Sequence, residues 1–432
     1  MTAPLRVGIA GLGTVGGWTL RLLTERRAAL AAAAGRDIEV AAVSARQRGR
    51  DRGIALDGLA WHDDPAALAR NPKVEAVVEL IGGAEGPALA TVEAALAVGK
   101  PVVTANKALL AAHGLRLAAM AEEAGVALAF EAAVGGGIPV VKTLREALVA
   151  NRFGRVIGIL NGTSNYILTR MEEDGLSFDA ALAEAQRLGY AEADPSFDIG
   201  GHDTAHKLAI LTSLAFGTAI DADEVYVEGI AAITPLDLAM AEELGYRIKL
   251  IGVAISTEAG IEQRVHPAMV PKNGAIARIR GVTNAVALDG DATGEITLAG
   301  AGAGGAATAS AVVGDIVDVA RGLALPPFGR PAAMLQPFRR APMQRHAGGY
   351  YIRLHAFDRP GVFAGIAQRM AEGSISLESI VQRRQPAASA DAVPVVLITH
   401  ATTEAAVRQA LDGIVADGLV AGQPQIIRIE KE

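Results

Sequence analysis

A short glycine motif near the start of the chain constrains its fold most strongly. The apolar run RVGIA (residues 6–10) is typical of a strand, and GLGTVG (residues 11–16) follows it directly and opens a helical pattern. In a G-x-G-x-x-G turn, the first glycine allows the tight bend, the second lets backbone amides approach a pyrophosphate, and the third lets the helix pack closely. The helix N-terminus adds partial positive charge. We therefore predict that a dinucleotide contacts Gly11, Gly13, Thr14, Val15 and Gly16.

The first third of the chain alternates short apolar runs with helical patterns. The runs are LRVGIA (5–10), IEVAAVSA (38–45), VEAVVEL (74–80), KPVVTA (100–105) and GVALAFEA (125–132). Such alternation predicts a parallel, doubly wound sheet. The fold class is therefore α/β, with a Rossmann-type nucleotide-binding domain over residues 1–134. The helical run at 301–322 is expected to belong to the same domain.

Two further regions follow the first. Residues 135–300 mix helical patterns with strand-like runs such as YRIKLIGVAI, which predicts an α+β domain. Several prolines in a segment without periodicity predict a linker at 323–348. Residues 349–432 have the pattern of a separate small βαββαβ unit, a ferredoxin-like order.

Composition excludes several classes of partner. The chain of 432 residues carries a net charge of -7, so it offers no basic field for nucleic acid or for a membrane surface. It contains no cysteine, which rules out disulfides and thiolate metal sites, and no apolar run as long as a membrane span. We expect a cytoplasmic protein that binds small molecules.

The end of the second predicted strand bears on the choice of cofactor. An acid there would bind a ribose 2′-hydroxyl, but the strand ends in Ser44-Ala45-Arg46 and further arginines follow. An arginine suits a 2′-phosphate. We therefore expect NADP to contact Arg46, with NAD as the second choice; a solvated loop of arginines is the alternative interpretation.

The densest group of charges lies in GYAEADPSFDIGGHDTAHKLA (residues 189–209). Asp203 and Lys207 are four residues apart, so on a helix they share one face and can pair. The apolar run after them predicts a mostly buried helix, and acids and lysines are rarely buried without a purpose. Glu192 and Asp198 precede them in a loop with paired glycines. Such a group could grip and protonate a small zwitterion.

Two histidines of the same stretch allow a different interpretation. His202 and His206 are four residues apart, as in many zinc sites. A zinc hydrolase also needs a third ligand and a general base, and no other histidine of the chain lies in a recognisable third-ligand motif. The zinc interpretation also leaves GLGTVG unexplained, so it is the weaker one.

Several motifs together resemble one enzyme family. GLGTVG, Thr104-Ala105-Asn106-Lys107, EAAVGGGIP, NGTSNYIL and the charged stretch occur in the order typical of homoserine dehydrogenases, over about residues 7–322. The resemblance implies NAD(P)-dependent interconversion of L-homoserine and L-aspartate 4-semialdehyde, in the biosynthesis of threonine, methionine and isoleucine. The alternatives are another NADP-linked dehydrogenase of the same plan and a non-catalytic amino-acid sensor.

The resemblance also assigns roles to residues. Lys207 would carry the proton at the substrate oxygen, and Lys107 would be a second catalytic lysine. The substrate would be bound by Glu192, Asp198, Asp203, Gly162 and Thr163, and the cofactor also by Thr104, Lys107, Gly189, Gly302 and Gly304. A monovalent cation, sodium in the family, would be bound by Glu131, Val134, Gly136 and Ile138. From the residues alone, Thr163 or Ser164 could simply cap a helix, 131–138 is a turn, and 300–305 could be a hinge.

The last part of the chain resembles an ACT domain, a βαββαβ regulatory unit. Asp358-Arg359-Pro360-Gly361-Val362 would join its first strand to its first helix. ACT domains usually bind an amino acid between paired copies, so threonine is the expected effector; a dimerisation module without a ligand is the alternative. The family also implies a homodimer or homotetramer formed through the central domain.

Overall fold

The first part of the chain forms a parallel sheet between two layers of helices. Its elements are β1 (Leu5–Ala10), α1 (Thr14–Glu25), α2 (Arg27–Ala34), β2 (Ile38–Ser44), β3 (Ala60–His62), α3 (Pro65–Arg70), β4 (Ala76–Glu79), α4 (Pro87–Ala97), β5 (Val102–Thr104), α5 (Lys107–Glu123) and β6 (Leu128–Ala129). The strand order is β3-β2-β1-β4-β5-β6 and every pairing is parallel. This is the order of a dinucleotide-binding fold, so the predicted Rossmann-type domain is confirmed.

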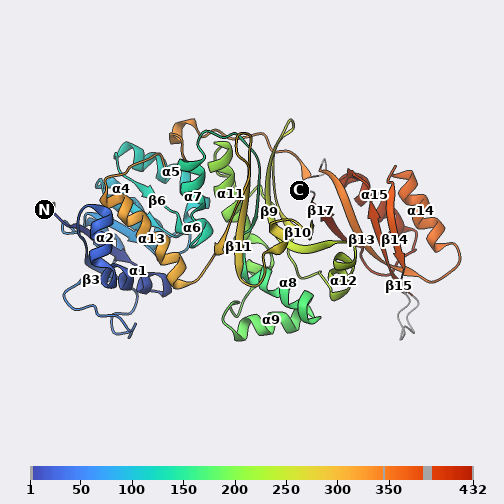
Figure 1. Ribbon diagram of the computed structural model, residues 1–432, viewed down its shortest axis with the longest axis horizontal. Coiled ribbons are helices and arrows are strands. Elements are labelled where there is room, and N and C mark those ends of the chain that lie inside the picture. Colours follow the sequence, from blue (N-terminus) through green and yellow to red (C-terminus); the bar gives the residue numbers. More distant parts are fainter. Residues whose placement is uncertain (1–2, 344–345, 383–391, 431–432) are drawn as a thin grey trace.

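A later helix completes this domain. The computed structural model, which describes residues 3–343, 346–382 and 392–430, places α13 (Gly305–Ala320) beside α1 (Figure 1). Apolar residues of α13 such as Val312 and Ile316 are buried in one core with Val7 and Ile9 of β1. Residues far apart in the sequence therefore form one domain.

The middle of the chain is an α+β unit. It contains α6 (Ala132–Gly135), α7 (Val140–Lys142), a π-helical turn η1 (Thr143–Ala147), β7 (Phe153–Ile159), α8 (Gly162–Asp174), α9 (Phe178–Arg187), α10 (Ser196–Ile199), α11 (His202–Phe216), β8 (Tyr226–Val227), α12 (Pro235–Glu243), β9 (Tyr246–Thr257), β10 (Gly260–Pro271), η2 (Ile276–Arg278), β11 (Thr283–Gly290) and β12 (Gly294–Ala301). Strands β12, β11, β7, β9 and β10 pair antiparallel in that order. Helix α11 packs against this sheet and is buried along nearly its whole length, more completely than the sequence predicts.

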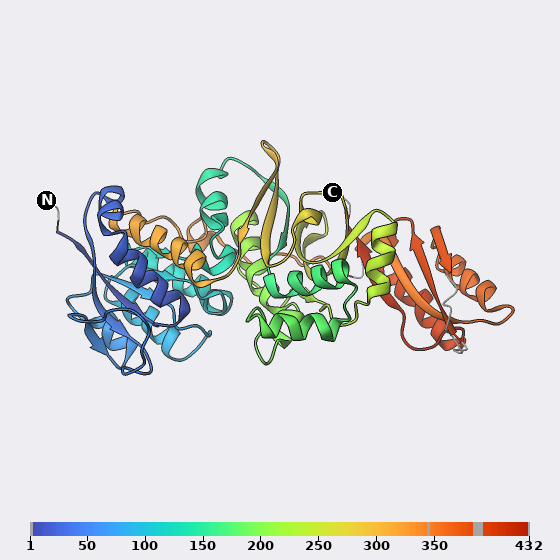
Figure 2. The ribbon, with the colours of Figure 1, turned by 60° about the horizontal axis from the view of Figure 1, so that its bottom comes forward.

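The last part of the chain is an α/β unit at the opposite end of the molecule from β1. After η3 (Ala332–Met334) come β13 (Ala347–Phe357), α14 (Val362–Glu372), β14 (Leu377–Gln382), β15 (Ala392–Thr399), β16 (Thr402–Thr403), α15 (Glu404–Ala416) and β17 (Gln425–Ile429). Apart from the two-residue β16, the order is βαββαβ. Figure 2 shows the three regions in a row, with the middle unit between the other two.

The sheet of the middle unit continues into the last unit. Strand β17 pairs with β13 on one side and, in parallel, with β10 on the other, through Ala268 opposite Arg428 and Met269 opposite Ile429. The resulting sheet of 11 strands crosses the boundary between the two units, which the prediction of a separate small unit did not anticipate. The predicted linker is packed as well, since the ring of Phe328 lies 5.0 Å from that of Phe130. Within the described residues, no helix is long and apolar enough to cross a membrane.

Candidate active site between the first two domains

The glycine turn after β1 has the geometry that a dinucleotide requires. Gly11 has a φ of 104°, which favours glycine. A Cβ at Gly16 would lie 1.9 Å from the carbonyl oxygen of Gly11, so only glycine lets α1 begin this close to the turn. A Cβ at Gly13 would meet nothing within 4 Å, which leaves that backbone open. A pyrophosphate therefore fits at the start of the helix, next to Thr14 and Val15.

A buried carboxylate organises the strand ends next to this turn. Strand β4 ends at Glu79, which is fully buried. Glu79 accepts hydrogen bonds from the hydroxyl of Thr104 at 2.6 Å and from the backbone amide of Ile81 at 2.7 Å. Thr104, predicted to contact the cofactor, therefore directs its hydroxyl toward Glu79. Sequence reasoning missed Glu79, although an acid at the end of an otherwise apolar strand is a usable signal.

The predicted pair on α11 lies at the junction of the first two domains. Lys207 and Asp203 pair at 2.8 Å, and Lys107, the first residue of α5, pairs with the other oxygen of Asp203 at 3.1 Å. Burial opposes ionisation of Asp203, but the two lysines outweigh burial and hold its pKa well below the ordinary value. The structure thus brings Lys107 and Lys207 together on one carboxylate.

The ammonium group of Lys207 has one further partner. Its Nζ atom donates to the backbone carbonyl of Leu160 at 2.6 Å, just beyond the end of β7. A lysine ammonium has three donors, so Asp203 and Leu160 account for two of them. Among the described residues, one N–H of Lys207 therefore has no partner.

Helix α8 begins beside this pair, and its cap differs from the prediction. Neither Thr163 nor Ser164 caps the helix: the N-cap is Asn161, whose side-chain oxygen accepts the backbone amide of Ser164 at 2.8 Å. The hydroxyl of Thr163 instead donates to the carbonyl of Tyr190 at 2.5 Å. Asn161 also donates to Asp198, so residue 161, which was given no role from the sequence, belongs to the site.

The remaining predicted substrate residues differ in how close they lie to the cluster formed by Asp203, Lys107, Lys207 and Asn161. Asp198 lies within the cluster, and burial raises its pKa. Gly162 is the first residue of α8. Glu192 lies on an exposed loop, where its backbone carbonyl accepts a hydrogen bond from Gln186. Gly189 follows α9 with a φ of 76°.

Two of the loops that carry predicted cofactor and cation residues lie against each other. Arg46 is exposed just beyond the end of β2. Gly304 has a φ of 106° before α13, and a Cβ at Gly136 would lie 2.3 Å from the carbonyl oxygen of Gly302. The loop after α6 and the loop before α13 are therefore in direct backbone contact. Gly302 and Gly136, predicted to serve different ligands, are neighbours.

The predicted cation segment is more structured than a turn. Its residues 132–135 form α6, and the carboxylate of Glu131 accepts the backbone amides of Val141 and Lys142, each at 2.8 Å. Burial raises the pKa of Glu131 to about 7. The backbone amide of Glu131 donates to Asp315 of α13 at 2.9 Å. The carboxylate of Glu131 therefore joins the first two domains. Val134 and Ile138 of the same segment are buried.

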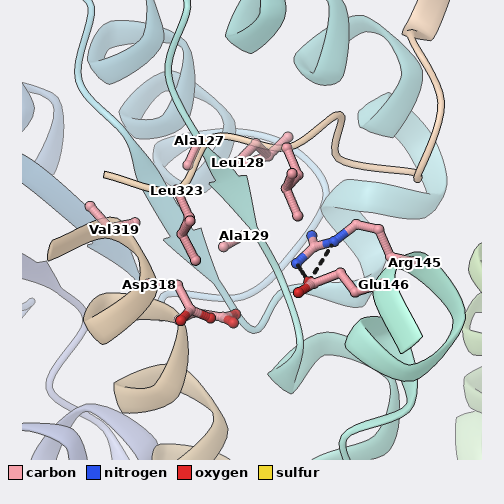
Figure 3. A pocket seen from close by; sticks show the side chains of 10 residues that line it. Ala127, Leu128, Ala129, Arg145, Glu146, Asp318, Val319 and Leu323 are labelled. Carbon is pink, nitrogen blue, oxygen red and sulfur yellow. Dashed lines mark hydrogen bonds and ion pairs between the residues drawn. The ribbon is translucent and has the colours of Figure 1, made fainter. Parts of the chain in front are cut away.

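A small hollow near this junction is not a substrate site. It lies between β6, η1 and α13, where Arg145 pairs with Glu146 (Figure 3). Its volume of about 20 Å³ holds little more than one water molecule. The hollow is therefore too small for an amino-acid substrate.

His202 and His206 do not form the zinc site of the alternative interpretation. His202 and His206 flank the ring of Phe197, at 6.1 Å and 5.4 Å between ring centroids. Among the described residues, no three histidine, aspartate or glutamate side chains are grouped so that they could hold a metal. The zinc interpretation has no support in this geometry.

A parallel sheet with a glycine turn, next to a buried lysine–aspartate pair, defines a nicotinamide-dependent oxidoreductase. Two family models match the chain: "Homoserine dehydrogenase, NAD binding domain" over residues 11–131 and "Homoserine dehydrogenase" over residues 139–317. The chain belongs to the homoserine dehydrogenase family. It therefore interconverts L-homoserine and L-aspartate 4-semialdehyde and acts on a CH–OH group with a nicotinamide cofactor.

Relatives and solved structures agree over the full length. The homoserine dehydrogenase of Pseudomonas aeruginosa is 46% identical over 99% of both chains, and that of Neisseria gonorrhoeae is 42% identical over 99% of both. The crystal structure of a homoserine dehydrogenase from Thiobacillus denitrificans matches with a TM-score of 0.93 and 46% identity, over 99% of this chain and 98% of that one. A hyperthermophilic archaeal homoserine dehydrogenase in complex with NADPH matches with a TM-score of 0.65 and 26% identity, over 74% of this chain and 99% of that one.

Proposed function

We propose that Lys207 donates and accepts the proton at the substrate oxygen, with Asp203 and Lys107 as its partners. The observation that carries the proposal is the position of the Asp203 carboxylate between the two lysines, at 2.8 Å from Lys207 and 3.1 Å from Lys107. The Asp203 carboxylate thus fixes the position of the Lys207 ammonium group and is shared with Lys107.

The chemistry of the reaction fits this arrangement. A bound nicotinamide cofactor supplies or accepts the hydride at the substrate carbon. As the aldehyde is reduced, negative charge develops on its oxygen, and the free N–H of Lys207 stabilises that charge and donates the proton. In the reverse direction Lys207 takes the proton from the hydroxyl of homoserine. The carbonyl of Leu160 fixes the ammonium group in place at 2.6 Å.

The rest of homoserine carries a carboxylate and an ammonium group. The backbone amides of Gly162 and Thr163 lie in the first turn of α8, where helix-start amides attract a carboxylate. Asp198 and Asp203 supply the negative charge for the ammonium group. Glu192 joins them in this proposal because its side chain is exposed and therefore accessible to a substrate.

The cofactor proposed for the glycine turn is NADP, with NAD also accepted. Arg46 supports this choice because it is exposed just beyond β2, where a 2′-phosphate is read in this fold. We also propose a sodium site at Glu131, Val134, Gly136 and Ile138. Two features of this segment support it: the carboxylate of Glu131 is buried, and the backbone bends sharply at Gly136.

The last unit is proposed to be an ACT regulatory domain that binds threonine, and the enzyme is proposed to be a homodimer or homotetramer. The βαββαβ order supports the first proposal. The continuous sheet between β10 and β17 supports it further, because binding at the last unit could then affect the middle one.

One assay tests the reaction and its regulation together. Purified protein is mixed with L-homoserine and NADP or NAD, with and without threonine, and the absorbance of the reduced nicotinamide is followed. We expect turnover with both cofactors, a higher kcat/KM with NADP, and a lower rate with threonine. A folded protein without turnover on either cofactor would contradict the proposal.

A further inference from the structure

Asn161 lies at the centre of the charged cluster. It follows Leu160 just beyond β7, and only 5% of it is exposed. Its side-chain nitrogen donates to Asp198 at 2.7 Å and to Asp203 at 2.9 Å. Its oxygen accepts the backbone amide of Ser164 at 2.8 Å. One side chain therefore connects α8, α10 and α11.

The partners of Asn161 fix the orientation of its amide group. Carboxylates only accept hydrogen bonds, and a backbone amide only donates. Turning the amide over would direct its oxygen at Asp198 and Asp203 and its NH₂ group at the N–H of Ser164. Only the present orientation satisfies all three partners.

The two carboxylates need a neutral donor because they are like charges in a buried place. Asp203 is paired with both lysines, whereas Asp198 receives its hydrogen bond from Asn161. Like charges held close together repel strongly where water is scarce. Without the NH₂ group, Asp198 would be free to turn away from Asp203.

We propose that Asn161 is a positioning residue that holds Asp198 beside the Asp203–Lys207 pair, so that the ammonium group of the substrate meets two carboxylates at one place. This inference rests on the proposed function. It predicts that Asn161 affects the recognition of an amino-acid substrate more than the binding of the cofactor. Because Asn161 also caps α8, the two roles must be separated.

A pair of variants separates them. Aspartate caps helices about as well as asparagine, so Asn161→Asp keeps the cap, removes both N–H donors and adds a third carboxylate. Ser177→Ala is the matched control, because the side chain of Ser177 caps α9 through the amide of Ala180 on an exposed surface. It removes a cap and leaves the cluster intact.

The experiment measures kcat and KM for L-homoserine between pH 6 and 10, together with the melting temperature and the Kd of the nicotinamide cofactor. For Asn161→Asp we expect a lower melting temperature, because a third carboxylate joins Asp198 and Asp203, an unchanged cofactor Kd, and a kcat/KM lower by about 10- to 100-fold, mainly through KM. The acid limb of its pH profile should move to higher pH, because added negative charge raises the pKa of neighbouring carboxyl groups. Ser177→Ala should lower the melting temperature alone.

The inference about Asn161 and the proposed function would be contradicted by different results. Wild-type kcat/KM and pH profile in Asn161→Asp would overturn the inference and leave Asn161 as a helix cap. Wild-type protein that binds the cofactor but does not oxidise homoserine would instead overturn the proposed function.

Discussion

At the residue scale, the reaction depends on the one N–H of Lys207 that its partners leave free. Lys207→Ala removes the proton donor while Lys107 still pairs with Asp203, so the cluster keeps one counter-charge. We expect kcat to fall by about 10²- to 10⁴-fold, the usual range for loss of an acid–base group, with the cofactor Kd unchanged. Stopped-flow absorbance and cofactor titration would check this, with the exposed Lys73→Ala as control. Near-normal turnover would mean that another group carries the proton.

A second residue-scale prediction concerns Glu131, whose pKa burial raises from 4.5 to about 7. Between these values the folded protein holds a proton that the unfolded chain has lost, so stability is highest below the lower value and falls as pH rises through the window. Bound sodium would favour the ionised form and reduce this loss. We therefore expect sodium chloride, compared with tetramethylammonium chloride, to raise the melting temperature at pH 8. Glu131→Gln should abolish that difference, and an equal effect of both salts on the wild type would contradict the cation proposal.

At the scale of elements, the glycine turn offers a test of cofactor binding that does not disturb folding. A Cβ at Gly13 meets open space, where we expect the pyrophosphate. Gly13→Ala should therefore keep the melting temperature and weaken cofactor binding at least tenfold, since one misplaced methyl prevents close backbone approach. Gly17→Ala, about one helical turn further along α1 and with equally open surroundings, is the control. Fluorescence titration with NADPH measures both, and an unchanged Kd in Gly13→Ala would place the pyrophosphate elsewhere.

The same elements show which features of the site can be predicted from the sequence and why others cannot. The turn at Gly11 and the pair of Asp203 with Lys207 depend on neighbours within one turn of chain, and both were predicted. Asn161 was missed because its carboxylate partners Asp198 and Asp203 lie 37 and 42 residues away, and no local pattern encodes such contacts. Glu79 could have been noticed as an acid that ends an apolar strand, but its partner Thr104, 25 residues away, could not. The helix cap at Asn161 was misplaced by two or three residues for a local reason, since serine, threonine and asparagine all cap well.

At the scale of the whole molecule, the junction between the middle and last units depends on buried charge. The guanidinium group of Arg428 on β17 is 1% exposed and contacts Glu404 of α15 at 2.8 Å and Glu228, next to β8, at 2.7 Å. Just beyond Glu228, the backbone amide of Ile230 donates to the carbonyl oxygen of Ile199, the last residue of α10, at 2.9 Å, and α11 begins three residues later at His202. A continuous set of contacts therefore runs from the last unit to the helix that carries Lys207.

Arg428→Met should test how much this junction stabilises the molecule. Methionine keeps much of the apolar volume but leaves Glu404 with Arg408 as its remaining cation, so we expect a loss of about 3 kcal/mol, the lower end for breaking a buried pair. Arg369→Met breaks the exposed pair with Asp417 and should change stability little, because water screens such pairs. Urea unfolding followed by far-ultraviolet circular dichroism compares the two. Equal losses of stability in the two variants would show that burial adds nothing at this junction. A larger loss for Arg428→Met, together with weaker inhibition by threonine, would show that these contacts hold the last unit in place. It would also show that they transmit the state of the last unit to α11.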